Sequence, residues 1–203
     1  ARCQPFINAD VPIFIDKPLC DNLSDLEIFQ KWIGEGKNFI SSSAMRYCKE
    51  YEPYHLSTHE LGDLRYVNIT MAKSWEKYGI HALETVYPIV GPGFESIQNI
   101  GDKNRNIVHL HHSKGIDINI ANISDMLGGF GLISLMGTKG GIQIKSTDTY
   151  YAFKKQLQSY VNYLQTCHKP VPWNETYELM QLVSAGIESR EKGGIKITLN
   201  KDN

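Results

Sequence analysis

Three residues that follow a short apolar run form the first group whose side chains could bind a ligand or take part in a reaction. Residues 11–15 are apolar and β-rich, which predicts a buried strand, and Asp16, Lys17 and Pro18 come directly after it. Ligands of open parallel sheets bind beyond the carboxyl ends of the strands. A lysine placed there can hold an anionic or polar ligand, and it can exchange a proton with a substrate hydroxyl. The alternative is an ordinary strand-exit turn with a solvated lysine, which is the commoner case on spacing alone.

A second group lies in a stretch with helical periodicity, residues 78–90. Tyr78, His81 and Glu84 are three positions apart, so all three lie near one face of the expected helix. A histidine with a tyrosine one turn before it and a carboxylate one turn after it can be oriented as a general acid–base. Gly79 would let a backbone or a ligand approach closely. The alternative is a core or surface histidine satisfied by Glu84.

Two histidines share a face of a predicted strand at residues 107–112. His109 and His111 could together bind a transition metal. No cysteine, aspartate or glutamate lies close enough in sequence to complete a three-ligand set, so we predict a polar sheet face and no metal site. The glycine clusters at 91–93, 128–131 and 137–141 match no phosphate-loop pattern and predict turns.

The elements that must position these groups fall into two regions. In the first, the strand at 11–15 is followed by a helix and a second strand at 38–43. Ser24 and Glu27 have the spacing of a capping box, which predicts the start of the helix. This strand–helix–strand order predicts a parallel βαβ unit.

The second region alternates differently. After a strand at 62–71 and the helix at 78–90, short β runs follow, with glycine turns between several of them. Two helices at 149–165 and 175–190 and a last strand at 195–199 complete the chain. The order predicts an α+β domain with a mostly antiparallel open sheet, covered by helices on one face. The β runs are 95–100, 107–112, 117–123, 130–137 and 142–145.

The composition excludes several classes of protein. The chain has 203 residues, of which 41% are hydrophobic, and a net charge of −1. That balance gives no electrostatic footprint for nucleic acid or for an anionic membrane. No run approaches the roughly 18 apolar residues of a membrane span. The four cysteines form no C-x-x-C pair, which favours reduced thiols and a cytoplasmic location.

Five segments of the chain, taken in order, resemble the glucose–fructose oxidoreductase and inositol dehydrogenase family, the MocA-like oxidoreductases. They cover nearly the whole chain. The resemblance implies an N-terminal Rossmann domain that carries NAD or NADP. It also implies a C-terminal α/β domain whose open sheet forms the substrate site and, in many members, the oligomer interface. The segments are 12–19, 39–47, 78–84, 150–157 and 184–189.

The family's Glu-Lys-Pro motif stands here as Asp16-Lys17-Pro18. The resemblance implies that these three residues face the cofactor, that Lys17 contacts both the substrate and the nicotinamide, and that Pro18 shapes the nicotinamide pocket. Arg46, just after the second strand, is a candidate for lining the substrate cleft.

The family's helical Asp-x-Gly-x-His motif also maps onto the chain. Its glycine is Gly79 and its histidine is His81, the implied catalytic acid–base, while Lys77 stands at the aspartate position. Tyr78 and Glu84 flank the histidine and are candidate substrate residues.

The function expected from the resemblance is hydride transfer between a nicotinamide and a hydroxyl-bearing carbon of a sugar or cyclitol. No G-x-G-x-x-G precedes Asp16. We therefore expect residues 1–44 to be the C-terminal remnant of a Rossmann domain and residues 45–203 to be a substrate and oligomerisation domain. On this interpretation the chain is truncated and is inactive alone.

The expected partners are a small sugar or polyol and, through the open sheet, further copies of the chain; neither nucleic acid nor a membrane is expected. The alternatives are a non-catalytic dimerising module and a metal-dependent enzyme that uses His109 and His111.

Overall fold

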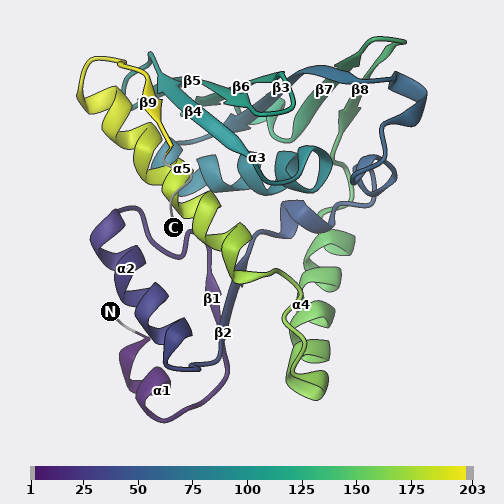
Figure 1. The fold of residues 1–203 in the computed structure, drawn as a ribbon. Coiled ribbons are helices and arrows are strands. Elements are labelled where there is room, and N and C mark those ends of the chain that lie inside the picture. Colours follow the sequence, from purple (N-terminus) through teal and green to yellow (C-terminus); the bar gives the residue numbers. More distant parts are fainter. Residues whose placement is uncertain (1–2, 200–203) are drawn as a thin grey trace.

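A two-stranded parallel sheet and a seven-stranded mixed sheet form the framework of the computed structural model, which describes residues 3–199 (Figure 1). In Figure 1 the larger sheet lies at the top and the smaller one below it, with helices between and beside them. Within the described residues, no helix combines the length and the apolar character needed to cross a lipid bilayer.

The smaller sheet is the parallel βαβ unit that the sequence predicts. Its strands pair in register, with Asp16 opposite Ser42, so both strands end at the same edge of the sheet. The connecting helix buries Leu26 and Phe29 with Trp32, at helical spacing. The elements are α1 (Gln4–Asn8), β1 (Ile13–Asp16), α2 (Leu23–Gly34) and β2 (Phe39–Ser42).

The start of α2 differs from the prediction. Asn22 is the N-cap, and its side-chain oxygen accepts a hydrogen bond from the backbone N–H of Asp25 at 2.8 Å. Ser24 lies inside the helix, where its hydroxyl donates to the same oxygen at 2.7 Å. The predicted capping box of Ser24 and Glu27 is therefore wrong, because an asparagine two positions earlier supplies the cap.

The larger sheet has the strand order β8-β7-β3-β6-β5-β4-β9. β3 and β6 pair in parallel, and the other adjacent strands pair antiparallel, so the predicted mostly antiparallel sheet is confirmed. The strands are β3 (Leu64–Ala72), β4 (Phe94–Asn99), β5 (Arg105–His112), β6 (Ile116–Ile123), β7 (Leu132–Gly137), β8 (Gly141–Lys145) and β9 (Ile197–Thr198). Short 3₁₀ turns lie at η1 (Ala44–Tyr47), η2 (Glu52–Tyr54), η3 (His59–Leu61) and η4 (Leu127–Gly129).

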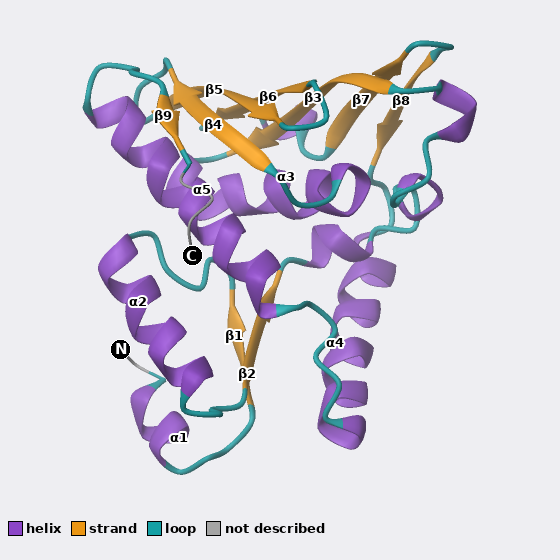
Figure 2. Ribbon diagram, viewed as in Figure 1, coloured by secondary structure: helices purple, strands orange, loops and turns teal. Residues whose placement is uncertain are grey.

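Three long helices pack on these sheets. Figure 2 shows α3 (Trp75–Val90) and α5 (Trp173–Glu191) beneath one face of the larger sheet, as predicted. α4 (Thr149–Thr166) returns to the smaller sheet instead. There the Tyr160 ring lies 5.7 Å from the Phe14 ring, and its hydroxyl donates to the Pro12 carbonyl at 3.0 Å. The segment after residue 45 thus contributes to both halves of the fold.

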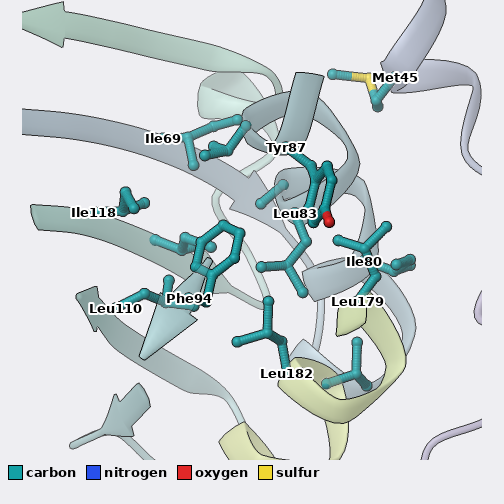
Figure 3. Close-up of a cluster of buried hydrophobic side chains, with 14 of the residues drawn as sticks. Met45, Ile69, Ile80, Leu83, Tyr87, Phe94, Leu110, Ile118, Leu179 and Leu182 are labelled. Atoms are coloured by element: carbon teal, nitrogen blue, oxygen red, sulfur yellow. The ribbon is translucent and has the colours of Figure 1, made fainter. Parts of the chain in front are cut away.

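The main core lies between the larger sheet and its two helices (Figure 3). Inward residues alternate with outward ones along β5 and β6, which gives the burial of these strands its two-residue period. The side chains that meet there are fully or almost fully buried. They include Ile69, Leu110 and Ile118 from the strands, Leu83 and Tyr87 from α3, and Leu179 and Leu182 from α5.

One tryptophan joins α3 to α5. Trp75 is fully buried, and its indole Nε1 donates to the Val183 carbonyl of α5 at 2.9 Å. A Cβ on Gly79 would lie 2.6 Å from the ring, and a Cβ on Gly186 would lie 2.6 Å from Nε1. The close approach at Gly79 is therefore made by the indole of Trp75, and not by a backbone or a ligand as predicted.

We expect Gly186→Ala to lower the free energy of unfolding by about 1–3 kcal/mol, because the new methyl group overlaps the Trp75 indole. Urea unfolding measures the change. The matched control is Gly34→Ala in α2, where nothing lies within 4 Å of the added Cβ. Equal effects of the two substitutions would contradict the packing argument.

Candidate active site

A pocket of about 490 Å³ lies where the two halves of the fold meet. β1 ends at Asp16, so Lys17 enters the pocket from the carboxyl edge of the smaller sheet. Lys73 enters from the end of β3, and Tyr78 and His81 enter from the first turns of α3. The full lining is Asp16, Lys17, Ala72, Lys73, Tyr78, His81, Leu127, Phe130 and Phe153.

Lys17 is held against the wall of the pocket. Its side chain is 19% exposed, and Nζ lies 3.7 Å from the Asp16 carboxylate. The ammonium group also lies 5.4 Å from the centre of the Tyr78 ring, within the range of a cation–π contact. The Lys17–Pro18 peptide bond is cis. Lys17 is thus a positioned donor and not a solvated turn residue.

His81 is oriented by a serine. Its Nδ1 lies 2.6 Å from the Ser43 hydroxyl, and that oxygen accepts a hydrogen bond from the Met45 amide at 3.0 Å. A hydroxyl donates one hydrogen bond and accepts two, so the Ser43 oxygen can either donate its proton to Nδ1 or accept one from it, and the tautomer of His81 decides which. When Ser43 donates to Nδ1, the ring proton of His81 is on Nε2.

Burial, together with the positive charges of Lys17 and Lys73, lowers the pKa of His81 to about 3. The imidazole is therefore neutral at pH 7, with one ring nitrogen as a hydrogen-bond donor and the other as an acceptor.

This pKa predicts an acid sensitivity. The unfolded chain binds a proton at His81 near pH 6.5 and the folded chain near pH 3, so stability falls as the pH drops through this window. We expect His81→Gln to lose less stability over the same range than the unmodified chain. Chemical unfolding at several pH values measures this, and parallel losses in the two proteins would refute it.

Tyr78 packs between the two lysines and the histidine. Its ring lies 4.7 Å from the His81 ring, and its hydroxyl lies 2.8 Å from Lys73 Nζ. The predicted grouping of Tyr78 with His81 on one helix face is confirmed by this contact.

Glu84 lies one turn further on and is completely enclosed. It forms an ion pair with Arg46 and accepts the Ser43 backbone N–H at 3.3 Å. Arg46 also pairs with Glu175 at 3.0 Å. The interpretation in which Glu84 itself orients His81 is therefore wrong: Glu84 anchors Ser43, and Ser43 holds the imidazole. Neither Arg46 nor Glu84 lines the pocket described above.

The histidine pair of β5 lies on the outer face of the larger sheet. His109 Nε2 and His111 Nδ1 lie 3.1 and 3.0 Å from one carboxylate oxygen of Asp117. Asp117 faces His111 across the β5–β6 hairpin, which sequence distance did not reveal. Between residues 3 and 199, no group of three or more histidine, cysteine, aspartate or glutamate side chains is placed to hold a metal ion.

Comparison with known proteins gives matches at the level of structure. No family model and no curated protein sequence matches the chain. The myo-inositol dehydrogenase of Corynebacterium glutamicum superposes with a TM-score of 0.79 at 19% identity, over 98% of this chain and 76% of that one. The myo-inositol dehydrogenase of Lactobacillus casei, solved with NAD(H) and myo-inositol, gives 0.78 at 16% identity, over 97% and 73%.

A third neighbour is GenD2 of gentamicin A biosynthesis, solved with NAD. It gives a TM-score of 0.82 at 13% identity, over 98% of this chain and 74% of that one. The chain has the inositol dehydrogenase fold. The resemblance seen in the sequence motifs is thereby confirmed for the fold, which places the α+β sheet and its helices as expected.

Within this inositol dehydrogenase fold, the sequence motifs do not single out the serine that holds His81 or the second lysine of the pocket. Ser43 directly follows β2 at the start of η1, and its proximity to His81 depends on the packing of η1 against α3. Lys73 stands between β3 and α3 in a left-handed backbone conformation, with a φ of 65°. The position of Lys73 between a strand and the start of a helix is a sequence feature that could identify it, since such junctions often face ligands.

Proposed function

We propose that the chain forms the substrate-binding and nicotinamide-facing part of an NAD(P)-dependent oxidoreductase, acting at a hydroxyl-bearing carbon of a sugar or cyclitol. The observation that carries the proposal is the meeting of Lys17 and His81 in one pocket. Lys17 follows β1 of the smaller sheet and His81 lies on α3, they are fixed by separate contacts, and both line the same pocket.

A nicotinamide fits the edge from which Lys17 projects. Asp16 and Ser42 end the two parallel strands side by side, and the pocket beyond them has aromatic and aliphatic walls suited to a planar ring. In the proposal, Asp16, Lys17 and Pro18 hold the nicotinamide end of NAD or NADP. When bound, the cofactor supplies the hydride chemistry.

The chain's own residues supply binding and proton handling. In the direction of carbonyl reduction, Lys17 donates to the substrate oxygen that becomes a hydroxyl. In the proposal Ser43 donates its proton to Nδ1 of His81, so that the Nε2–H donates to the same substrate oxygen and stabilises the charge that develops there. Tyr78 keeps both groups apart from bulk water by packing against each. The substrate contacts predicted for Arg46 and Glu84 stay a prediction.

The neighbours support this proposal through what they bind. One is a dehydrogenase solved with NAD(H) and myo-inositol, and another is solved with NAD. They give no support to the alternative, a non-catalytic module.

We further propose that residues 1–44 end a nucleotide-binding domain and that residues 45–203 form the substrate domain. Copies of the chain would associate through the uncovered face of the larger sheet, where Ile107 and Met136 are exposed. The cysteines are unpaired, which supports a cytoplasmic location.

The test is an assay of the protein isolated from its natural source, with NAD⁺ or NADP⁺ and a panel of sugars and cyclitols. We expect polyol-dependent formation of reduced nicotinamide. The proposal fails if no compound in the panel is oxidised with either dinucleotide while the protein is folded by circular dichroism.

A further inference from the structure

The charge of the pocket identifies a narrower class of substrate than a neutral polyol. Lys17 and Lys73 both line it, and the one carboxylate in the lining belongs to Asp16. The Asp16 side chain is 80% exposed and lies beside Lys17. Lys73 therefore contributes a positive charge that no lining residue balances.

Lys73 is fixed in place by its backbone and its side chain. The backbone adopts a φ of 65°, a conformation that disfavours residues with a side chain, and its N–H donates to the Ile123 carbonyl at 3.1 Å. Strained residues of this kind concentrate at ligand sites. The fold thus holds a lysine at a position where a glycine would relieve the strain.

The ammonium group of Lys73 is held in position by Tyr78. Nζ lies 2.8 Å from the Tyr78 hydroxyl and 4.5 Å from the centre of the same ring. A lysine ammonium has three N–H donors, and the contact with Tyr78 occupies one. Within residues 3–199, no carboxylate forms an ion pair with Lys73. Its remaining donors are available to a ligand.

The two lysines produce the attraction for an anion. Leu127, Phe130 and Phe153 flank the lysines, but Leu127 and Phe153 are 68% and 57% exposed, so the attraction for an anion comes from the charges of Lys17 and Lys73 and is strongest at low salt. The positive charges of Lys17 and Lys73 both act at His81, where each lowers the pKa of the imidazole in addition to the effect of burial. A site for a neutral sugar would instead present amides and carboxylates, whereas the lining holds no asparagine or glutamine and Asp16 is its one carboxylate.

We propose that this pocket takes a polyol that carries an anionic group, a carboxylate or a phosphate, and that Lys73 with the Tyr78 hydroxyl binds that group. The inference rests on the proposed function, because it places the reacting carbon at Lys17 and His81 and the anionic group at Lys73. Lys73 is thus the residue that determines specificity.

The experiment measures binding to the chain without cofactor, by calorimetry at low salt, with D-glucose, D-glucuronate and D-glucose 6-phosphate. We expect at least one anionic sugar to bind about tenfold or more tightly than glucose. Preference for glucuronate assigns a carboxylate, and preference for the phosphate ester assigns a phosphate. Equal affinity for all three, or no measurable binding of either anion, overturns the proposal.

Two variants localise the effect. Lys73→Met should bring the ratio of anionic to neutral affinity close to one. Lys103→Met removes the same charge from an exposed turn outside the pocket and should leave the ratio unchanged. An unchanged ratio in Lys73→Met would overturn the assignment. The binding experiment uses no dinucleotide, so it tests the anion site separately from the oxidoreductase function. Anion preference without turnover in the enzyme assay would reject the oxidoreductase function and keep the anion site. Turnover without anion preference would keep the oxidoreductase function and reject the anion site.

Discussion

Lys17→Met is expected to lower kcat/KM for the proposed dehydrogenation by about 10²–10⁴-fold, the range typical of a positioned proton donor. Methionine keeps most of the side-chain volume, but it removes the ammonium group that lies over the Tyr78 ring and would face the substrate oxygen. Steady-state kinetics with the substrate and dinucleotide found in the assay above measures the loss.

The matched control for this variant is Lys31→Met. Lys31 lies on the exposed surface of α2, with a side chain that is 76% exposed, and it does not line the pocket. Its removal should change kcat/KM by less than about twofold, since an exposed charge at that distance is screened. A Lys17→Met protein that retains full activity would exclude Lys17 from proton transfer.

Arg46→Met is expected to destabilise the chain by about 3–5 kcal/mol, the cost of leaving a buried charge without its partner. Burial raises the pKa of Glu84, and the guanidinium of Arg46 acts against that effect. Without Arg46, the enclosed Glu84 loses its cation and Glu175 loses a hydrogen bond of 3.0 Å. Urea or thermal unfolding gives the change in the free energy of unfolding.

Arg65→Met provides the comparison for Arg46. Arg65 pairs with Asp63 at 3.1 Å, but the two side chains are 54% and 75% exposed. A surface pair of this kind contributes about 0–1 kcal/mol. If the two arginine variants lose the same stability, the network around Glu84 is not the structural centre that its burial indicates.

The sequence predicts the order of elements well because apolar periodicity is a local property. The parallel unit around α2, the hairpins of the larger sheet and the three long helices all follow from it. Element ends are less well predicted. α3 begins at Trp75, one turn before the expected position, because the indole packs inward and extends the apolar face.

The contacts within the candidate site join residues that are far apart in the sequence. Lys17 and His81 are recognisable from their motifs, but the partner of His81 is not. Glu84, at helical spacing, is the nearest carboxylate in sequence, whereas the contact is made by Ser43, which follows β2 and lies 38 positions away. Tertiary packing decides which polar group forms a hydrogen bond with a buried imidazole, and the periodicity of the sequence carries no information about it.

The path of the chain has a mechanical consequence. The backbone passes between the two sheets after β2, before α4 and again between α4 and α5. α4 is bonded to the smaller sheet through Tyr160 and Gln156, and α5 packs on both α2 and α3. A hinge between the halves would have to bend three connections and slide one helix at once. The separation of Lys17 from His81 is therefore set by the packing of these helices, and a ligand that enters the pocket meets a site that is already assembled.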